Sequence, residues 1–291
     1  MINMLEIFSF LTLLFGISLA AAFDVKITPT EIPDELTHAL IALGILFSSL
    51  ESLIQFNFQI LINSLIYGIS FLAFGFLLYK LGQWGGGDAK VLASIGFFSP
   101  LISNLLNQPL AEFAFTYLIN LFLLGAVYMI FYSIVLALIN RKIISNFLKN
   151  AKSSSKIIVF SFLLLFSVTF FINSQLFKIY KIPFELASII FNSLLICFLT
   201  ICLFLLWVFV KSVENVAFKK RIPISKLKVG DVLLESKVWE GLTEEEVKRI
   251  KRSGKKFVWI KEGVRFAPSF PLALLFTFYY GNVLFSFFKF I

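Results

Sequence analysis

The sequence predicts an all-α polytopic membrane protein of about eight transmembrane helices with a small α/β cytoplasmic domain. Two observations lead to this fold class. First, 59% of the 291 residues are hydrophobic, compared with about 45–50% in soluble domains, and the mean hydropathy is +0.91. Second, apolar runs of the length needed to cross a bilayer recur along most of the chain.

The apolar runs predict eight spans, of which the second and the fourth are short. The first span has no Lys or Arg ahead of it and is longer than the apolar part of a secretory signal peptide, so we expect it to be retained. The predicted spans cover residues 4–23, 36–51, 60–81, 89–106, 112–139, 157–177, 185–211 and 269–288.

The distribution of basic residues predicts a multi-pass protein of the plasma membrane with its N-terminus outside. In that orientation the cytoplasmic side holds all of the 26 Lys and Arg residues except Lys178, Lys181 and Lys289. The loop 141–156 is the most informative segment, because it is short and carries basic residues but no acid. This bias accounts for the net charge of +9, so we expect contact with the lipid bilayer and none with nucleic acid.

Charge density divides the chain into four expected parts. Residues 1–140 form a membrane core, 141–211 add transmembrane helices, 212–268 form the small cytoplasmic α/β domain, and 269–291 form the final transmembrane helix.

Short elements can be predicted inside the small domain. Thr243 followed by Glu246 is typical of a helix N-cap with a capping box. Residues 232–234 and 256–260 are typical of short strands.

Two aspartates stand at the ends of predicted spans on the same predicted side. Asp24 directly follows the first span, and Asp88 opens the fourth. A charged side chain costs less free energy at a membrane boundary than at the bilayer centre, but its presence there still calls for an explanation. Two carboxyl groups that meet can hydrolyse a peptide bond without a metal, since one, ionised, takes a proton from water while the other, protonated, polarises the carbonyl. Asp24 and Asp88 are therefore the candidate catalytic residues of the membrane core.

Three consecutive glycines, Gly85, Gly86 and Gly87, directly precede Asp88. Glycine lets another backbone approach closely and tolerates a positive φ angle, so this run suits a site that admits an extended peptide. For the glycines alone, an ordinary turn between two helices is the better explanation.

The motif around Asp88 resembles a known family. Gly85–Lys90 (GGGDAK) is similar to the Gly-x-Gly-Asp signature of type IV prepilin peptidases and archaeal preflagellin peptidases. In that family a second catalytic Asp ends the first span of the core and precedes an Ile-Pro-Asp/Asn sequence, which Asp24 and Ile32–Thr37 (IPDELT) match here. The gap before the proline is longer in this chain, which leaves Asp34 as a weaker alternative. Gly263–Pro268 also resembles the C-terminal region of archaeal members.

The resemblance implies a membrane aspartic endopeptidase with its active site facing the cytoplasm. Its substrates would be pilin-like or archaellin precursors with a class III signal peptide, cut behind the short leader. Bacterial bifunctional members carry an N-terminal region with paired cysteines that this chain lacks, so we expect a peptidase without methyltransferase activity. Neither the substrate's scissile sequence nor the oligomeric state follows from the residues.

Other polar residues near the motif have less specific roles. Pro33 and Lys90 are expected to shape the site or contact substrate, although Lys90 also fits a basic anchor beside a span. Asp34 is expected to cap the second span's N-terminus. Glu51, on the opposite side, is expected to be solvated.

No cofactor or metal is expected. His38 is the only histidine, and a lone histidine without partner ligands does not make a metal site. Cys197 and Cys202 lie five positions apart in one apolar run, on different sides of a helix, which suits packing rather than a metal pair or a disulfide.

Two other classes of membrane protein remain as alternatives. An ion-coupled transporter can use membrane carboxylates as a relay, but it typically places them near the midplane and shows repeated halves. A presenilin-type or signal-peptide-peptidase-type protease would place its first Asp after a Tyr, in the span next to the one that carries the second Asp. Here Phe23 precedes Asp24, and two full spans separate the two acids.

Overall fold

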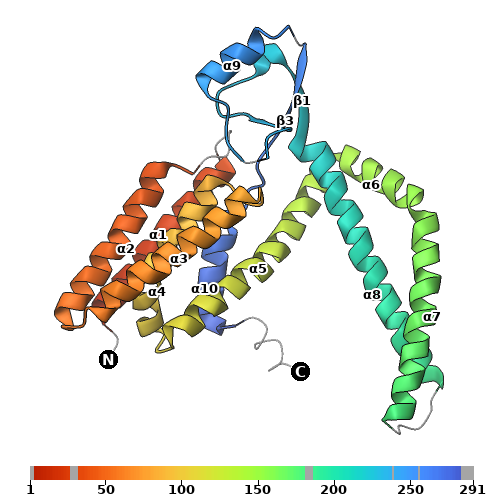
Figure 1. Cartoon of the computed structure of the whole chain (residues 1–291), viewed down its shortest axis with the longest axis horizontal. Coiled ribbons are helices and arrows are strands. Elements are labelled where there is room, and N and C mark those ends of the chain that lie inside the picture. The colour runs from red at the N-terminus through yellow and green to blue at the C-terminus, as the bar shows by residue number, and fades with distance from the viewer. Residues whose placement is uncertain (1–2, 27–31, 181–185, 238, 255, 283–291) are drawn as a thin grey trace. The chain divides into compact units, whose positions relative to one another are not determined.

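A computed structural model describes residues 3–26, 32–180, 186–237, 239–254 and 256–282 (Figure 1). The chain divides into two compact units. One unit comprises Met1–Phe131 together with Lys219–Ile291, and the other comprises Tyr132–Phe218.

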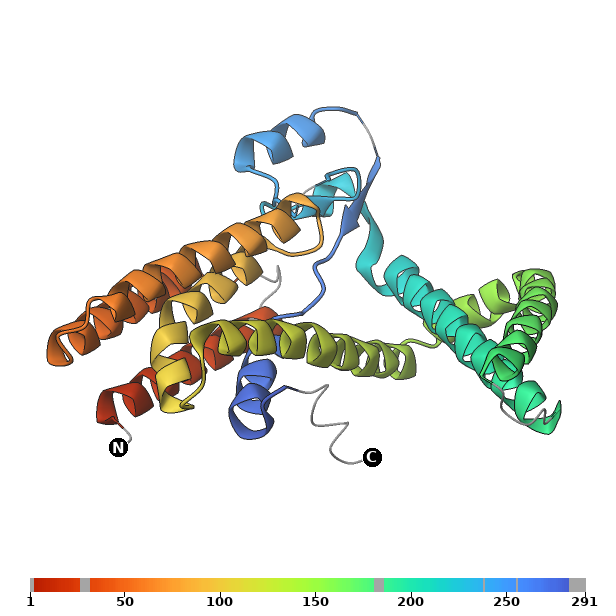
Figure 2. The ribbon, with the colours of Figure 1, turned by 60° about the horizontal axis from the view of Figure 1, so that its bottom comes forward.

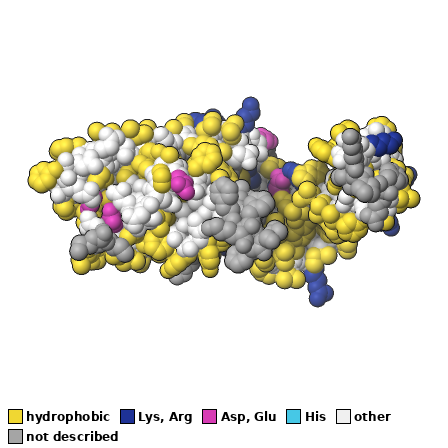
Figure 3. All heavy atoms as spheres, turned by 90° about the horizontal axis from the view of Figure 1, so that it is seen from below, with side chains coloured by type: hydrophobic (Ala, Val, Ile, Leu, Met, Phe, Trp, Pro, Cys, Tyr) yellow, Lys and Arg dark blue, Asp and Glu magenta, His cyan; other side chains and the backbone are white. Residues whose placement is uncertain are grey.

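The helical, polytopic class is confirmed. Among the described residues, six helices are long and apolar enough to cross a membrane, and hydrophobic side chains cover much of the face shown in Figure 3. The other two predicted spans correspond to helices α4 and α10, which do not meet that criterion, and the end of the last predicted span lies outside the described residues. The six helices are Met4–Val25, Asp34–Ile54, Gln59–Lys80, Leu110–Ile139, Ser155–Ile179 and Leu186–Phe218.

The first unit is built around helix α4 (Gly86–Leu105). This helix packs against α1 (Met4–Lys26), α2 (Asp34–Ile54) and α3 (Gln59–Lys80), and the four helices lie side by side (Figures 1 and 2). Apart from Lys90, α4 is buried continuously from Ala89 to Ser103. The other three helices therefore shield α4 from lipid.

Glycine allows α3 and α4 to approach closely at two levels. A Cβ atom at Gly96 would lie 2.5 Å from the backbone oxygen of Tyr67, and one at Gly75 would lie 2.8 Å from Cα of Ala89. Such contacts are far too short for any larger residue, so the two backbones meet only because neither position carries a side chain. The second contact fixes α3 directly beside Asp88.

Helices α5 (Leu110–Ile139) and α10 (Ser269–Tyr280) complete the hydrophobic core of this unit. Helix α10 packs against α1, and its Phe270 is completely buried. The last described helix is thereby brought back to the first.

The small domain also belongs to the first unit. It holds β1 (Lys219–Pro223), β2 (Val232–Leu233), β3 (Phe257–Lys261) and α9 (Glu244–Lys251). The antiparallel sheet has the order β1-β3-β2 and packs on a small core that includes Val247 and Ile260. The two strands and the helix predicted from the sequence are confirmed, whereas β1, with its charged Lys-Lys-Arg start, was not anticipated.

The second unit contains α6 (Arg141–Ser153), α7 (Ser155–Ile179) and α8 (Leu186–Val213). The expectation of a loop over 141–156 is wrong, because α6 occupies most of it. The side chain of Asn140 caps this helix by accepting a hydrogen bond from the backbone N–H of Lys142. Ile143 is fully buried in a cluster with Val213, so α6 is amphipathic and packs through one apolar face.

Candidate active site

Asp24 and Asp88 lie at the same end of the first unit. Asp24 stands near the end of α1, and Asp88 stands in the first turn of α4. Contacts of one segment connect the two positions, because Ala267 hydrogen-bonds to Asp24 and its neighbour Phe266 packs on Trp84, four residues before Asp88. Asp24 is only 6% exposed, and Asp88 is half-buried. We refer to these two residues as the aspartate pair.

Asp88 takes part in the capping of its own helix. The backbone N–H of Gly85 donates a hydrogen bond of 3.1 Å to Oδ2 of Asp88. Gly85 is the N-cap and Asp88 the third helical residue, which is the spacing of a capping box, although the cap here is a glycine. The hydrogen bond fixes the side chain of Asp88 relative to the start of α4.

The three glycines before Asp88 differ in the space around them. None of the three has a positive φ, so their backbone conformation does not itself require glycine. A Cβ at Gly87 would come within 3.0 Å of Cβ of Ile32, whereas one at Gly86 would have Tyr79 as its nearest neighbour, at 4.0 Å. Gly86 therefore offers open backbone next to the aspartate pair.

Asp24 has a hydrogen-bond partner that was not predicted from the sequence. The backbone N–H of Ala267 donates a hydrogen bond of 3.1 Å to Oδ2 of Asp24, and the positive charge of Arg265 also acts on this carboxyl group. Both residues belong to the segment between β3 and α10, more than 240 positions along the chain from Asp24. Only the likeness of Gly263–Pro268 to archaeal family members drew attention to this segment.

Pro33, Asp34 and Lys90 lie near the same end of the bundle. Pro33 is the N-cap of α2, and its fixed φ of −57° suits the start of a helix. The expectation that Asp34 caps α2 is wrong, because Asp34 is the first helical residue and its side chain makes no capping hydrogen bond. Its Oδ1 instead accepts a hydrogen bond of 2.6 Å from Nζ of Lys90. This ion pair links the first turn of α2 to the first turn of α4.

An aromatic cluster supports the turn that leads to Asp88. Trp84 is 6% exposed and directly precedes the three glycines. Its ring packs against Phe122 of α5, Phe266 and Phe270, with ring centroids 5.5–6.1 Å apart. Such aromatic packing buries large apolar area and restrains the turn from one side.

Comparison with known proteins shows what the region around the aspartate pair is similar to. Residues 10–140 match the type IV leader peptidase family. The match includes the aspartate pair, Pro33, the three glycines and Lys90, whereas the small domain, α6 to α8 and α10 lie outside it.

Two archaeal relatives of the leader peptidase region have descriptive names. A prepilin peptidase, EppA, of Methanothermobacter thermautotrophicus is 29% identical over 84 residues, which is 29% of this chain and 22% of that protein. A preflagellin peptidase of Methanocaldococcus jannaschii is 26% identical over 142 residues, 48% of this chain and 58% of that protein. The chain thus matches less than two thirds of the length of either relative.

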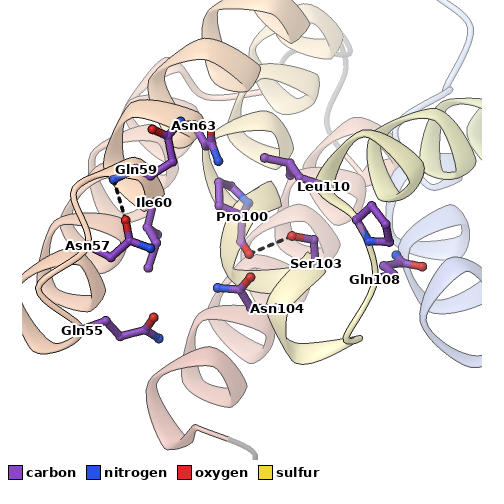
Figure 4. Close-up of a pocket in the computed structure, with 11 residues that line it drawn as sticks. Gln55, Asn57, Gln59, Ile60, Asn63, Pro100, Ser103, Asn104, Gln108 and Leu110 are labelled. Atoms are coloured by element: carbon purple, nitrogen blue, oxygen red, sulfur yellow. Dashed lines mark hydrogen bonds between the residues drawn. The ribbon is translucent and has the colours of Figure 1, made fainter.

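The leader peptidase region also carries a polar pocket at the end remote from the aspartate pair. The turns after α2 and α4 line a cavity of about 320 Å³ (Figure 4). The labelled side chains Gln55 and Asn57 come from the turn after α2, and Asn104 comes from the last turn of α4. None of the predicted site residues lines it.

Glu51 lies near the remote end and differs from expectation. It is fully buried rather than solvated. In place of water, the side-chain amides of Asn3 and Gln55 donate hydrogen bonds to its Oε1.

Within the described residues, no group of three or more His, Cys, Asp or Glu side chains is placed to hold a metal ion.

Proposed function

We propose that this protein is a membrane aspartic endopeptidase that removes the short leader from type IV pilin-like or archaellin precursors. The observation that supports the proposal is that Asp24 and Asp88, connected through the contacts of Ala267 and Phe266, both lie inside the region that matches the leader peptidase family. The names of the two relatives, a prepilin peptidase and a preflagellin peptidase, support this class of substrate.

The proposed chemistry uses the aspartate pair as acid and base. One carboxylate accepts a proton from water, and the resulting hydroxide attacks the scissile carbonyl carbon. The other carboxyl group, protonated at the start, donates its proton to the carbonyl oxygen. When the tetrahedral intermediate collapses, the C–N bond breaks and a proton passes to the leaving amine. Two neighbouring carboxyl groups suit this reaction because they resist being ionised together, so one of them keeps a proton.

The proposed orientation places this chemistry at the cytoplasmic edge of the membrane. The bias of Lys and Arg puts the N-terminus outside, so the end of α1 with Asp24 and the start of α4 with Asp88 face the cytoplasm. A precursor with a basic leader ahead of an apolar helix would present its junction at this depth. The open backbone at Gly86 is where the extended peptide would approach. We expect no methyltransferase activity.

Cleavage of precursors in membranes tests the proposal. A panel of pilin and archaellin precursors is incubated with wild type, Asp24→Asn, Asp88→Asn and Asp34→Asn at matched expression. We expect loss of cleavage in the first two variants and retention in Asp34→Asn, because only the aspartate pair contacts the reacting atoms. Full activity in either Asp24→Asn or Asp88→Asn would exclude the two-carboxylate mechanism. No cleavage of any precursor by wild type would direct attention to ion transport instead.

A further inference from the structure

The segment that joins β3 to α10, residues 262–268, runs from the small domain to the aspartate pair. We call it the β3–α10 linker. At its far end the backbone N–H of Ala267 donates to Oδ2 of Asp24, a buried hydrogen bond of 3.1 Å. The charge of Arg265, two positions earlier, acts on the same carboxyl group. A backbone donor of this short segment thus contacts one acid of the pair, and a positive charge lies two positions away on the same segment.

The linker is held in place beside the second acid of the pair as well. The ring of Phe266 packs on Trp84, with ring centroids 5.5 Å apart, and Trp84 immediately precedes the glycines of the Asp88 turn. On its other side Phe266 fits tightly against α5, where a Cβ at Gly125 would lie 2.8 Å from the ring. The side chain between Arg265 and Ala267 therefore anchors the linker to the turn that leads to Asp88.

The small domain contacts the turn between α3 and α4 at a second point. The indole N–H of Trp239 donates a hydrogen bond of 2.9 Å to the backbone oxygen of Gly82, just after α3. The ammonium group of Lys261, the last residue of β3, stands 4.4 Å from the centroid of the Trp239 ring. The same ammonium donates a hydrogen bond to the backbone oxygen of Ser236. Trp239 is therefore fixed by β3, the strand from which the linker starts.

We propose that the β3–α10 linker is a positioning element of the active site, in which the Ala267 N–H sets the orientation of the Asp24 carboxyl group and Arg265, two positions earlier, stabilises its charged form. The inference deepens the proposed function and rests on it. With Oδ2 engaged by the Ala267 N–H, the rotamer of Asp24 is fixed and its other oxygen serves the water. Through the contacts of Phe266 and Trp239, the small domain fixes the positions of Asp24 and Asp88 relative to each other.

The alternative is that the linker merely packs against the bundle. The two cases differ in kinetics, because a two-carboxylate reaction depends on the orientation of its acids, and a misplacement of about 1 Å can lower the rate by about 10²-fold. A positioning role lowers kcat while KM for the precursor stays nearly unchanged. A packing role alone lowers the amount of folded enzyme and leaves kcat per folded molecule unchanged.

The test measures kcat and KM for precursor cleavage by the full-length enzyme in detergent, normalised to the monodisperse fraction. Ala267→Pro removes the N–H donor, and Ala267→Gly is its matched control, since it keeps the donor. Arg265→Gln removes the charge, and Arg265→Lys restores it. We expect kcat to fall by about 10-fold or more in Ala267→Pro and Arg265→Gln, with recovery in both controls.

Other outcomes decide against the proposal. Wild-type kcat in Arg265→Gln together with wild-type kcat in a folded Ala267→Pro would overturn it. If Ala267→Pro does not fold, Arg265→Gln decides alone, with wild-type kcat overturning the proposal and a fall rescued by Arg265→Lys supporting it. Cleavage by wild type with no effect of these variants removes only this inference. Failure of wild type to cleave any precursor removes the proposed function and this inference with it.

Discussion

Nζ of Lys90 lies 2.6 Å from Oδ1 of Asp34, which gives Asp34 a cation for a partner. Asp24, ten positions earlier in the chain, instead meets a backbone N–H and the charge of a second acid, Asp88. Two acids ten positions apart in the sequence therefore have different immediate contacts. The ion pair makes Asp34 a structural link between α2 and α4, whereas the proposed role in proton transfer belongs to Asp24.

Removal of the Asp34–Lys90 ion pair is expected to have little effect. The two side chains are 60% and 31% exposed, and exposed ion pairs contribute about 0–1 kcal/mol to stability. We therefore expect Asp34→Asn and Lys90→Gln to keep the thermal midpoint of wild type within a few degrees and to keep cleavage. Thermal unfolding in detergent and the precursor assay check this. Loss of cleavage in Asp34→Asn, with folding intact, would move the candidate catalytic role from Asp24 to Asp34.

Gly86 and Gly87 are expected to tolerate alanine differently. A Cβ at Gly86 meets nothing closer than 4.0 Å, so Gly86→Ala should fold like wild type. Because the substrate backbone is proposed to approach there, the added methyl group should raise KM for the precursor. A Cβ at Gly87 would lie 3.0 Å from Ile32, so Gly87→Ala should lower thermal stability instead. A wild-type KM in Gly86→Ala would show that the peptide takes another path.

Gly96 is expected to be the most sensitive glycine between α3 and α4. An alanine there would place its Cβ 2.5 Å from the backbone oxygen of Tyr67 and 2.9 Å from Cα of Gly68. Backbone atoms of packed helices have little freedom to move aside, and overpacking typically costs about 1–3 kcal/mol. Gly96→Ala should therefore unfold at a lower temperature than Gly86→Ala, which serves as its control. Equal midpoints for the two variants would contradict the close approach of α3 and α4.

The capping box of α9 makes this helix sensitive to acid. The backbone N–H and hydroxyl of Thr243 donate to the Glu246 carboxylate and hold the pKa of Glu246 below its usual value. A carboxyl group with a lowered pKa in the folded state stabilises that state above its unfolded pKa, and the contribution disappears as the pH falls through the folded value. We expect hydrogen-exchange protection in α9 to be constant near neutral pH and to decrease below about pH 4.3.

Two variants separate this effect from general acid unfolding. Thr243→Ala should weaken α9 by about 1 kcal/mol at neutral pH, which is typical of a lost N-cap. Glu246→Gln should remove the pH dependence of protection in α9. If α9 in Glu246→Gln loses protection in acid as wild type does, the capping carboxylate is not its cause.

The elements that follow from local patterns could be predicted from the sequence. The apolar runs identified the membrane helices, and the Thr243–Glu246 spacing identified α9. The α6 helix was missed because its basic residues were interpreted as those of a loop that determines topology. Its buried face becomes evident only once Ile143 meets Val213 of α8. Strand β1 was missed for a similar reason, because its pairing with β3 stabilises a sequence that starts with three cations.

The candidate site was predictable where it depends on a motif and not where it depends on tertiary contacts. The run of glycines and Asp88 stands out in the sequence, and so does Asp24 at the end of a span. The hydrogen bond from Ala267 to Asp24 involves a backbone donor, which any residue except proline supplies, so residue type gives no signal. Glu51 was misjudged likewise, since its amide partners Asn3 and Gln55 come from two different helix ends.

The burial of α4 has a consequence for how the protein is made. Its sequence, which includes Lys90 and Pro100, does not reach the apolarity of the six membrane helices, so α4 alone has a weak preference for lipid over water. During synthesis, the insertion of α4 into the membrane is expected to depend on α3. A tight turn connects α3 to α4, and α3 packs against α4 along its length. Asp88 would then reach the membrane boundary only as part of an assembled helical hairpin. The aspartate pair is therefore expected to form only after these helices have come together.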